Sequence, residues 1–148
     1  MNNELNPMNK FNFLLGKWNL KYNVPKSQFS EEDKGDGKGE IKRILNNQYV
    51  SFDYRAKLSN TQNSAHGIFA WDEKNKIYRY WWFEDSGAFM EATCNFIDEN
   101  TLCLNWHNSL LVQSFQKTED DLILLHMKHP ASANKFEIIL EVIFTKLI

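Results

Sequence analysis

The chain has 148 residues, of which 43% are hydrophobic and 14% aromatic, which is enough for a single domain with a substantial core. Its formal net charge of −2 gives the molecule no electrostatic reason to seek nucleic acid or acidic membranes. The N-terminus lacks the apolar run of a signal peptide, and no stretch approaches the ~20 apolar residues of a membrane span. We therefore expect a cytoplasmic protein that binds neither nucleic acid nor membrane.

The N-terminal region combines a polar segment with a short helix. Residues 1–10 are polar, and we expect them to be loosely held. Phe11, Leu14 and Leu15 fit one or two turns of helix, which Gly16 would end as a C-terminal cap. After the glycine the period changes to two, which predicts a half-buried strand whose apolar face is formed by Trp18, Leu20, Tyr22 and Val24.

Two more strands are predicted in the first 60 residues. Residues 27–38 are rich in charge and glycine and are predicted to form a flexible loop, because the glycines lack the spacing of a phosphate loop. A strand at about 38–45 then turns at two asparagines, which tolerate positive φ, into a strand at about 48–58. The second strand alternates cleanly and has one apolar face, made of Val50, Phe52, Tyr54, Ala56 and Leu58.

The stretch from His66 to Asp85, HGIFAWDEKNKIYRYWWFED, predicts a β-hairpin with two aromatic strands. The charged residues 72–76 form its turn. Alternation along the second strand divides its side chains between two faces. One face carries Tyr78, Tyr80, Trp82 and Glu84, and the other carries Ile77, Arg79, Trp81 and Phe83.

The rest of the chain continues as short strands linked by polar turns. These strands are predicted at about 88–97, 101–107, 110–117, 122–128 and 135–146. About ten strands with hairpin-length links favour a closed, all-β, antiparallel up-and-down barrel, because an open meander would leave two unpaired edges. We therefore expect one barrel domain over residues 11–148, with a β-sandwich as the alternative.

Short motifs along the chain resemble the lipocalin-like (calycin) barrels. Leu15-Gly16-Lys17-Trp18 is similar to their Gly-x-Trp opening. The resemblance is closest to a bacterial calycin-like family of unknown function, whose pattern falls on Gly67, Trp71, Asp72, Lys76, Tyr78, Trp82, Glu84, Thr145 and Lys146. It implies a barrel able to hold a ligand, with Trp18 closing one end under the side chain of Lys146. It implies no known reaction.

The family pattern favours an inward direction for the face of the hairpin that carries Trp82. A tight turn would bring two aromatic residues of the preceding strand to the same side. We therefore predict a lumen for a small apolar or aromatic molecule, lined by Tyr54, Phe69, Trp71, Tyr78, Tyr80, Trp82, Glu84 and His126. His126 is included because both faces of its strand are apolar. Trp81 and Phe83 would then point outward and could form a homodimer contact.

No stretch of the sequence is a catalytic signature, so whether the protein is an enzyme stays open. One alternative is an enzyme that uses Glu84 with Tyr80 or His126, and Glu84 with Glu91 is the candidate carboxylate pair. The other alternative is a filled barrel that acts as a dimer or interaction module. A solvent-linked cavity of ~300 Å³ or more would favour ligand binding over a filled barrel.

Metal and cofactor sites are not expected. Cys103 and His107 share a strand face but lie about 13 Å apart along it, too far for one zinc ion, and Cys94 and Cys103 are predicted to be free thiols. Nitrobindin-type haem barrels repeat glycine at every second position after the opening tryptophan, which this chain does not do after Trp18. We therefore predict no haem, no metal and no other cofactor.

Overall fold

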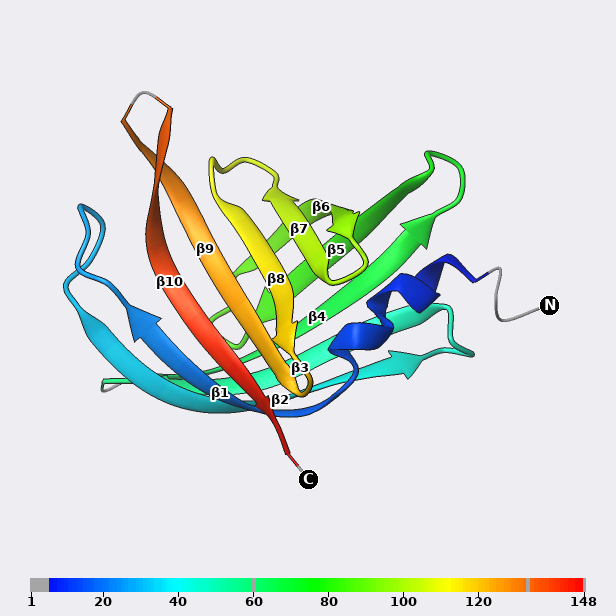
Figure 1. Ribbon diagram of the computed structural model, residues 1–148, viewed down its shortest axis with the longest axis horizontal. Coiled ribbons are helices and arrows are strands. Elements are labelled where there is room, and N and C mark those ends of the chain that lie inside the picture. The colour runs from blue at the N-terminus through cyan, green and yellow to red at the C-terminus, as the bar shows by residue number, and fades with distance from the viewer. Residues whose placement is uncertain (1–5, 60, 133, 148) are drawn as a thin grey trace.

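The computed structural model describes residues 6–59, 61–132 and 134–147, and these form a closed antiparallel barrel (Figure 1). Each strand pairs with its neighbours in sequence, and β1 closes the barrel against β10. The strands are β1 (Gly16–Val24), β2 (Asp33–Ile44), β3 (Tyr49–Leu58), β4 (Thr61–Asp72), β5 (Ile77–Glu84), β6 (Phe89–Asp98), β7 (Thr101–Trp106), β8 (Val112–Glu119), β9 (Leu122–Ser132) and β10 (Lys135–Lys146). The ten-stranded up-and-down barrel predicted from strand spacing is thereby confirmed.

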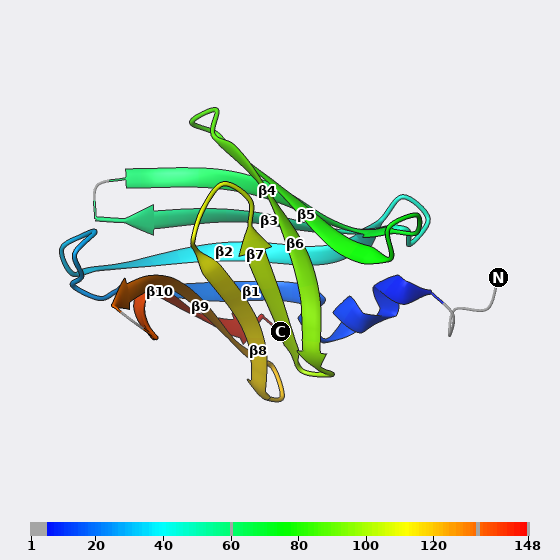
Figure 2. The ribbon, with the colours of Figure 1, turned by 90° about the horizontal axis from the view of Figure 1, so that it is seen from above.

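The two walls of the barrel are strongly twisted relative to each other. Seen from above, β2 and β3 run along one wall while β6, β7 and β8 cross them steeply on the other (Figure 2). Such crossing follows from the right-handed twist of strands and the tilt that barrel closure requires. In the described part of the chain, no helix is long and apolar enough to cross a membrane.

A short 3₁₀ helix, η2 (Pro7–Leu14), packs against one end of the barrel. Asn6 caps it, because its side-chain oxygen accepts a hydrogen bond from the backbone N–H of Met8 at 2.9 Å. The helix begins earlier than the apolar spacing predicted, and Met8 is buried rather than loosely held. It also ends earlier, since Leu15 is already extended and Gly16 opens β1 instead of capping the helix.

Trp18 closes the helix end of the barrel, as the resemblance implied. Its indole N–H donates to the carbonyl oxygen of Leu14 at 2.9 Å, and only 1% of the residue is exposed. The Nζ of Lys146 lies 5.4 Å from the centre of the Trp18 ring, a cation–π geometry. Gly16 makes room for this cation, since a Cβ there would lie 2.6 Å from Cε of Lys146.

Strand β2 corrects the prediction of a loop at residues 27–38. It begins at Asp33 and includes the glycines, which pair with β1 and β3. Glycine is required here because atoms of the neighbouring strands occupy the space that a side chain would fill. A Cβ at Gly37 would lie 2.3 Å from the carbonyl oxygen of Arg55 and 3.1 Å from the ring of Tyr22. Glycine is depleted in strands on average, and that tendency misled the sequence prediction.

The aromatic hairpin forms as predicted, with β4 and β5 joined by residues 73–76. Asp72 organises the turn, because its carboxylate accepts hydrogen bonds from the backbone N–H of Asn75 at 3.1 Å and from Nε of Arg79 at 2.9 Å. Hydrogen bonds from Asn75 and Arg79 lower the pKa of Asp72 to about 2, so the carboxylate stays charged at neutral pH. The register of the hairpin decides which aromatic side chains reach the lumen.

Candidate ligand-binding site

The half of the barrel away from η2 contains a cavity of about 240 Å³. Its lining is mostly aromatic and aliphatic, with a few polar groups. The lining residues come from all strands except β2: Tyr22, Phe52, Tyr54, Ala56, Leu58, Asn63, Tyr80, Trp82, Glu84, Met90, Trp106, Leu111, Gln113, Leu125, Met127, Leu140, Val142 and Phe144. Several of them, including Leu58, Glu84 and Leu140, are partly exposed and form a rim open to solvent.

Three of the predicted lining residues face the interior but do not line the cavity. Phe69, Tyr78 and Trp71 lie near the helix end, where Phe11 of η2 inserts between the strands. The ring centre of Phe11 is 4.8 Å from that of Phe69 and 5.4 Å from that of Tyr78. The Tyr78 hydroxyl donates to the carbonyl oxygen of Pro7 at 2.7 Å. These side chains therefore form the packed floor of the barrel.

Four of the predicted lining residues do meet at the cavity: Tyr54, Tyr80, Trp82 and Glu84. Their inward direction follows from the cross-strand register, in which Trp82 faces Gly67 and Tyr80 faces Phe69. The indole N–H of Trp82 donates to the hydroxyl oxygen of Tyr54 at 2.8 Å. Glu84 lies at the rim, where its carboxylate accepts a hydrogen bond from the Ser86 hydroxyl at 2.7 Å.

Tyr80 is held rigidly by its neighbours. Its ring stacks on Phe69, with centres 4.2 Å apart, and meets the edge of Trp106 at 5.7 Å. The ring lies over Gly67, because a Cβ at that glycine would approach the Tyr80 hydroxyl to 2.0 Å. Burial raises the pKa of Tyr80 well above its ordinary value, so the hydroxyl keeps its proton at neutral pH.

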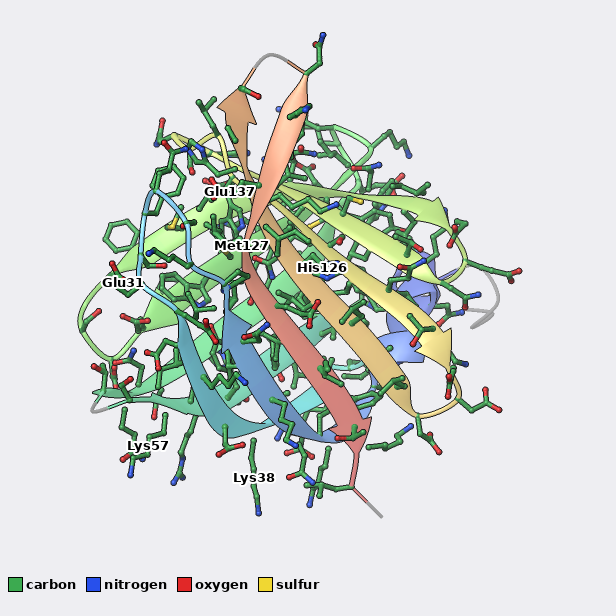
Figure 3. All side chains as sticks on the ribbon, turned by 60° about the vertical axis from the view of Figure 1, so that its left-hand side comes forward. Glu31, Lys38, Lys57, His126, Met127 and Glu137 are labelled. Carbon is green, nitrogen blue, oxygen red and sulfur yellow. The ribbon has the colours of Figure 1, made fainter. Side chains whose placement is uncertain are left out.

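His126 is not in the lumen, and its predicted inward direction is wrong. It lies on the outer face of β9 (Figure 3). Its Nε2 is 2.9 Å from a carboxylate oxygen of Glu141. Its neighbours Leu125 and Met127 line the cavity instead. The prediction failed because Leu124, on the same outer face, is apolar, so polarity did not distinguish the two faces.

The predicted carboxylate pair is also separated by strand alternation. Glu84 lines the cavity, whereas Glu91 faces outward, with its carboxylate oxygens 3.7 Å from Arg79 and 3.9 Å from His107. The two groups therefore cannot act together on one bound molecule. An enzyme that pairs Glu84 with His126 is excluded for the same geometric reason.

Cys94 and Cys103 are free thiols in this fold. They lie on paired strands but on opposite faces, since Cys103 is directly opposite Asn95. Burial raises the pKa of Cys94, which keeps that thiol protonated. No group of three or more His, Cys, Asp or Glu that could hold a metal occurs within the described residues.

Most of the residues that line the cavity were not among those predicted from the sequence. Phe52, Leu58 and Tyr22 lie on strand faces that were predicted to be apolar, so alternation alone could have assigned them to the lumen. Trp106 and Gln113 are joined by a hydrogen bond from the indole N–H to the amide oxygen at 3.1 Å. Nothing in the sequence indicated that this pair would meet inside the barrel.

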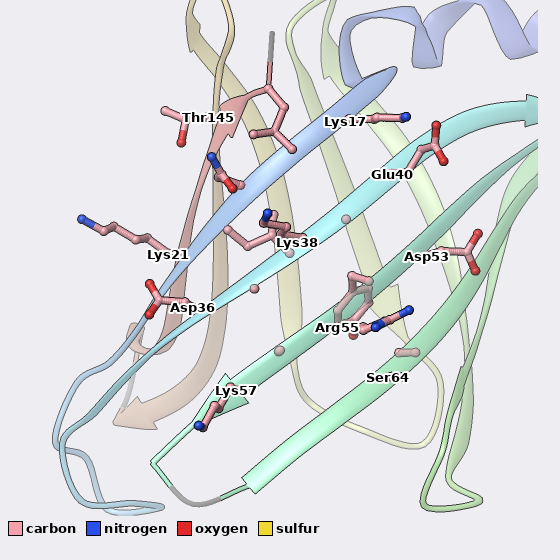
Figure 4. Close-up of a pocket in the computed structure, with 18 of the residues that line it drawn as sticks. Lys17, Lys21, Asp36, Lys38, Glu40, Asp53, Arg55, Lys57, Ser64 and Thr145 are labelled. Carbon is pink, nitrogen blue, oxygen red and sulfur yellow. The ribbon is translucent and has the colours of Figure 1, made fainter.

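A larger depression of about 1260 Å³ follows the outside of β1 to β4 and the end of β10 (Figure 4). Charges of both signs lie on it. Lys38 is directly opposite Arg55, and Glu40 is directly opposite Asp53. This mixture of charges selects no single class of ligand, whereas the lumen is mostly apolar.

Trp81 and Phe83 point outward, as predicted. Trp81 is opposite Glu91 on the outer face, and Phe83 is opposite Phe89. Phe83 is 47% exposed and Phe89 is 74% exposed, so the two rings form an apolar strip at one edge of the outer surface. The homodimer contact expected at this strip stays a prediction.

Comparison with known proteins identifies the fold but no sequence family. No family model matches the chain, and no curated protein matches its sequence. Among solved structures, Rv2717c from M. tuberculosis superposes with a TM-score of 0.64 at 10% identity, over 96% of this chain and 98% of that chain. The S-type phycobiliprotein lyase CPES from Guillardia theta superposes with a TM-score of 0.58 at 8% identity, over 93% of this chain and 90% of that chain. Both likenesses fit a calycin-like barrel fold.

Proposed function

We propose that the protein binds a small apolar or aromatic molecule in the lumen of its barrel. The cavity of about 240 Å³ is the observation that carries this proposal. This volume is below the ~300 Å³ expected above for a ligand-binding lumen, at which most ligand pockets begin, but an apolar cavity of about 150 Å³ is enough to hold benzene. The volume therefore suits a molecule of one or two rings, and it is too small for a large cofactor.

The composition of the lining supports binding better than catalysis. The lining includes five Trp and Tyr rings besides Phe52 and Phe144, and together they offer a broad apolar contact surface: Tyr22, Tyr54, Tyr80, Trp82 and Trp106. Glu84 is the single carboxylate among the described lining residues, and no histidine accompanies it there. A binding barrel therefore fits these groups better than an enzyme based on general acid–base chemistry.

The two adjacent tryptophans of β5 offer a sharp test. The neutral fluorophore aminonaphthalene should bind saturably and quench tryptophan emission, because Trp82 and Trp106 line the cavity. Trp82→Ala should weaken binding by about tenfold or more, since it removes a central aromatic contact. Trp81→Ala should leave the affinity unchanged, because that ring lies on the outer face. Fluorescence titration of the parent and both variants measures these affinities.

A second variant keeps the test independent of the stability of Trp82→Ala. Ala56 lines the cavity, so Ala56→Phe should fill the space and abolish binding while keeping the strand. Circular dichroism melting confirms that each variant is folded. Weaker binding in Trp81→Ala than in Trp82→Ala would place the ligand outside the lumen. Equal binding in all four proteins would show that the barrel interior is not the site.

A further inference from the structure

Resting on the proposed function, we infer that the bound molecule is a neutral aromatic compound with a hydrogen-bond acceptor, such as a ketone or aldehyde oxygen. That oxygen accepts from the hydroxyl group of Tyr22 or of Tyr80, both of which line the cavity. Three features of the described lining residues carry the inference: two buried hydroxyls without partners, free donors on Tyr54 and Gln113, and the absence of positive charge.

The hydroxyls of Tyr22 and Tyr80 are buried without a protein partner. Only 9% of Tyr22 and 2% of Tyr80 is exposed, and both side chains line the cavity. Within residues 6–59, 61–132 and 134–147, neither hydroxyl makes a hydrogen bond. Among the described residues, the Ser51 hydroxyl is the one fully enclosed side-chain oxygen that lacks a hydrogen-bond partner. The hydroxyls of Tyr22 and Tyr80 also lack a partner, so each must keep some accessible surface. Because both side chains line the cavity, a ligand atom there can satisfy these hydroxyls.

Apart from Asn63 and Glu84, the other polar groups of the cavity are already paired in a way that leaves donors free. The Tyr54 oxygen accepts from Trp82, so its own O–H remains available to donate. The Gln113 amide oxygen accepts from Trp106, which leaves the amide N–H groups. Both indole N–H groups are used in these bonds. Tyr54 and Gln113 therefore present donors to the cavity, and these favour a ligand that accepts.

The tyrosines keep their protons in this environment. Burial raises the pKa of Tyr22, and the nearby Tyr54 raises it further. Burial likewise raises the pKa of Tyr54 and of Tyr80. At physiological pH all three side chains are therefore neutral phenols that can donate.

Charge on the lining selects against an anion. The described lining residues include no Lys, Arg or His, and the one ionisable carboxylate, Glu84, lies at the rim. A ligand carboxylate would lose its hydration without gaining a counter-ion, and it would pass Glu84 on entry. The acceptor is therefore expected to be a neutral oxygen.

Acetophenone, cumene and benzoate separate these features, because they have the same ring and the same number of non-hydrogen atoms. Acetophenone has a neutral acceptor, cumene has none, and benzoate has a charged one. Dissociation constants for all three are measured by equilibrium dialysis with the parent and with Tyr22→Phe, Tyr80→Phe and Tyr78→Phe. Tyr78→Phe is the matched control, because its hydroxyl donates to the Pro7 carbonyl outside the cavity.

The decisive quantity is the ratio of the cumene constant to the acetophenone constant. We expect this ratio to fall roughly three- to tenfold in Tyr22→Phe or Tyr80→Phe, the size of one neutral hydrogen bond, and to stay unchanged in Tyr78→Phe. Benzoate should bind at least about tenfold more weakly than acetophenone. Comparing ratios cancels differences in water solubility between the two neutral compounds.

The possible outcomes distinguish the inference from the function on which it rests. If acetophenone and cumene both bind and neither tyrosine variant changes their ratio, the acceptor inference is overturned and the proposed function stands. If benzoate binds most tightly, the selection for a neutral ligand is wrong. If none of the three binds the parent saturably, the proposed function fails, and the inference fails with it.

Discussion

Replacing Trp18 with alanine should lower the free energy of unfolding by about 3–5 kcal/mol, the usual cost of truncating a buried aromatic side chain. The ring is 1% exposed and meets the edge of Phe144, with ring centres 6.1 Å apart. The change also leaves the Leu14 carbonyl without its indole donor and Lys146 without its aromatic partner. The expected loss is large because one side chain ties η2, β1 and β10 together.

Urea denaturation of the parent and of Trp18→Ala measures this loss. Trp81→Ala is the matched control, since it removes the same side chain from the outer face and should cost no more than about 1 kcal/mol. Lys146→Met should cost about 1 kcal/mol, because it removes the cation and keeps the alkyl chain. If Trp18→Ala and Trp81→Ala lose equal stability, Trp18 does not close the barrel end.

Phe11→Ala is expected to have a similarly large effect, also about 3–5 kcal/mol, because Phe11 anchors η2 in the barrel floor. Its ring is fully buried, and it meets Phe69, Tyr78 and Phe96 with centre distances of 4.8, 5.4 and 5.0 Å. Because these contacts lie at the end away from the cavity, the variant should still bind aminonaphthalene with nearly the affinity of the parent.

Urea denaturation and fluorescence titration test the two parts of this prediction separately. Phe83→Ala serves as the control, since the half-exposed outer ring should contribute no more than about 0.5 kcal/mol. A stability loss in Phe11→Ala without a loss of affinity would establish that floor and cavity are distinct. A loss of probe binding at full stability would show instead that the ligand contacts the floor.

Much of the fold could be predicted because period-two alternation is strong wherever a strand has one buried face. Strand β3 and strand β5 show this clearly, and their inward faces supplied Tyr54, Tyr80, Trp82 and Glu84. The stack of Lys146 on Trp18 was implied by the resemblance to calycin-like barrels, and the structure contains it.

Features that depend on packing between distant segments could not be predicted in this way. The depth at which η2 inserts decides that Phe69 and Tyr78 form floor rather than cavity, and no local pattern encodes that depth. The inner glycines of β2 resemble a loop in sequence, although the Tyr22 ring needs the space beside Gly37. In β9 both faces are apolar, so the direction of His126 was ambiguous.

A small apolar molecule is expected to enter the lumen, and the methionine methyl groups of the chain report directly on its entry. Met90 and Met127 line the cavity, whereas Met8 belongs to η2 and is buried at the opposite end. Nuclear magnetic resonance of isotope-labelled methionine methyl groups, recorded during titration with aminonaphthalene, compares these positions in one sample. We predict that ring currents of the bound probe shift the Met90 and Met127 signals in a saturable way and leave the Met8 signal in place. A shift confined to Met8, or saturated binding that moves neither Met90 nor Met127, would contradict the proposed site.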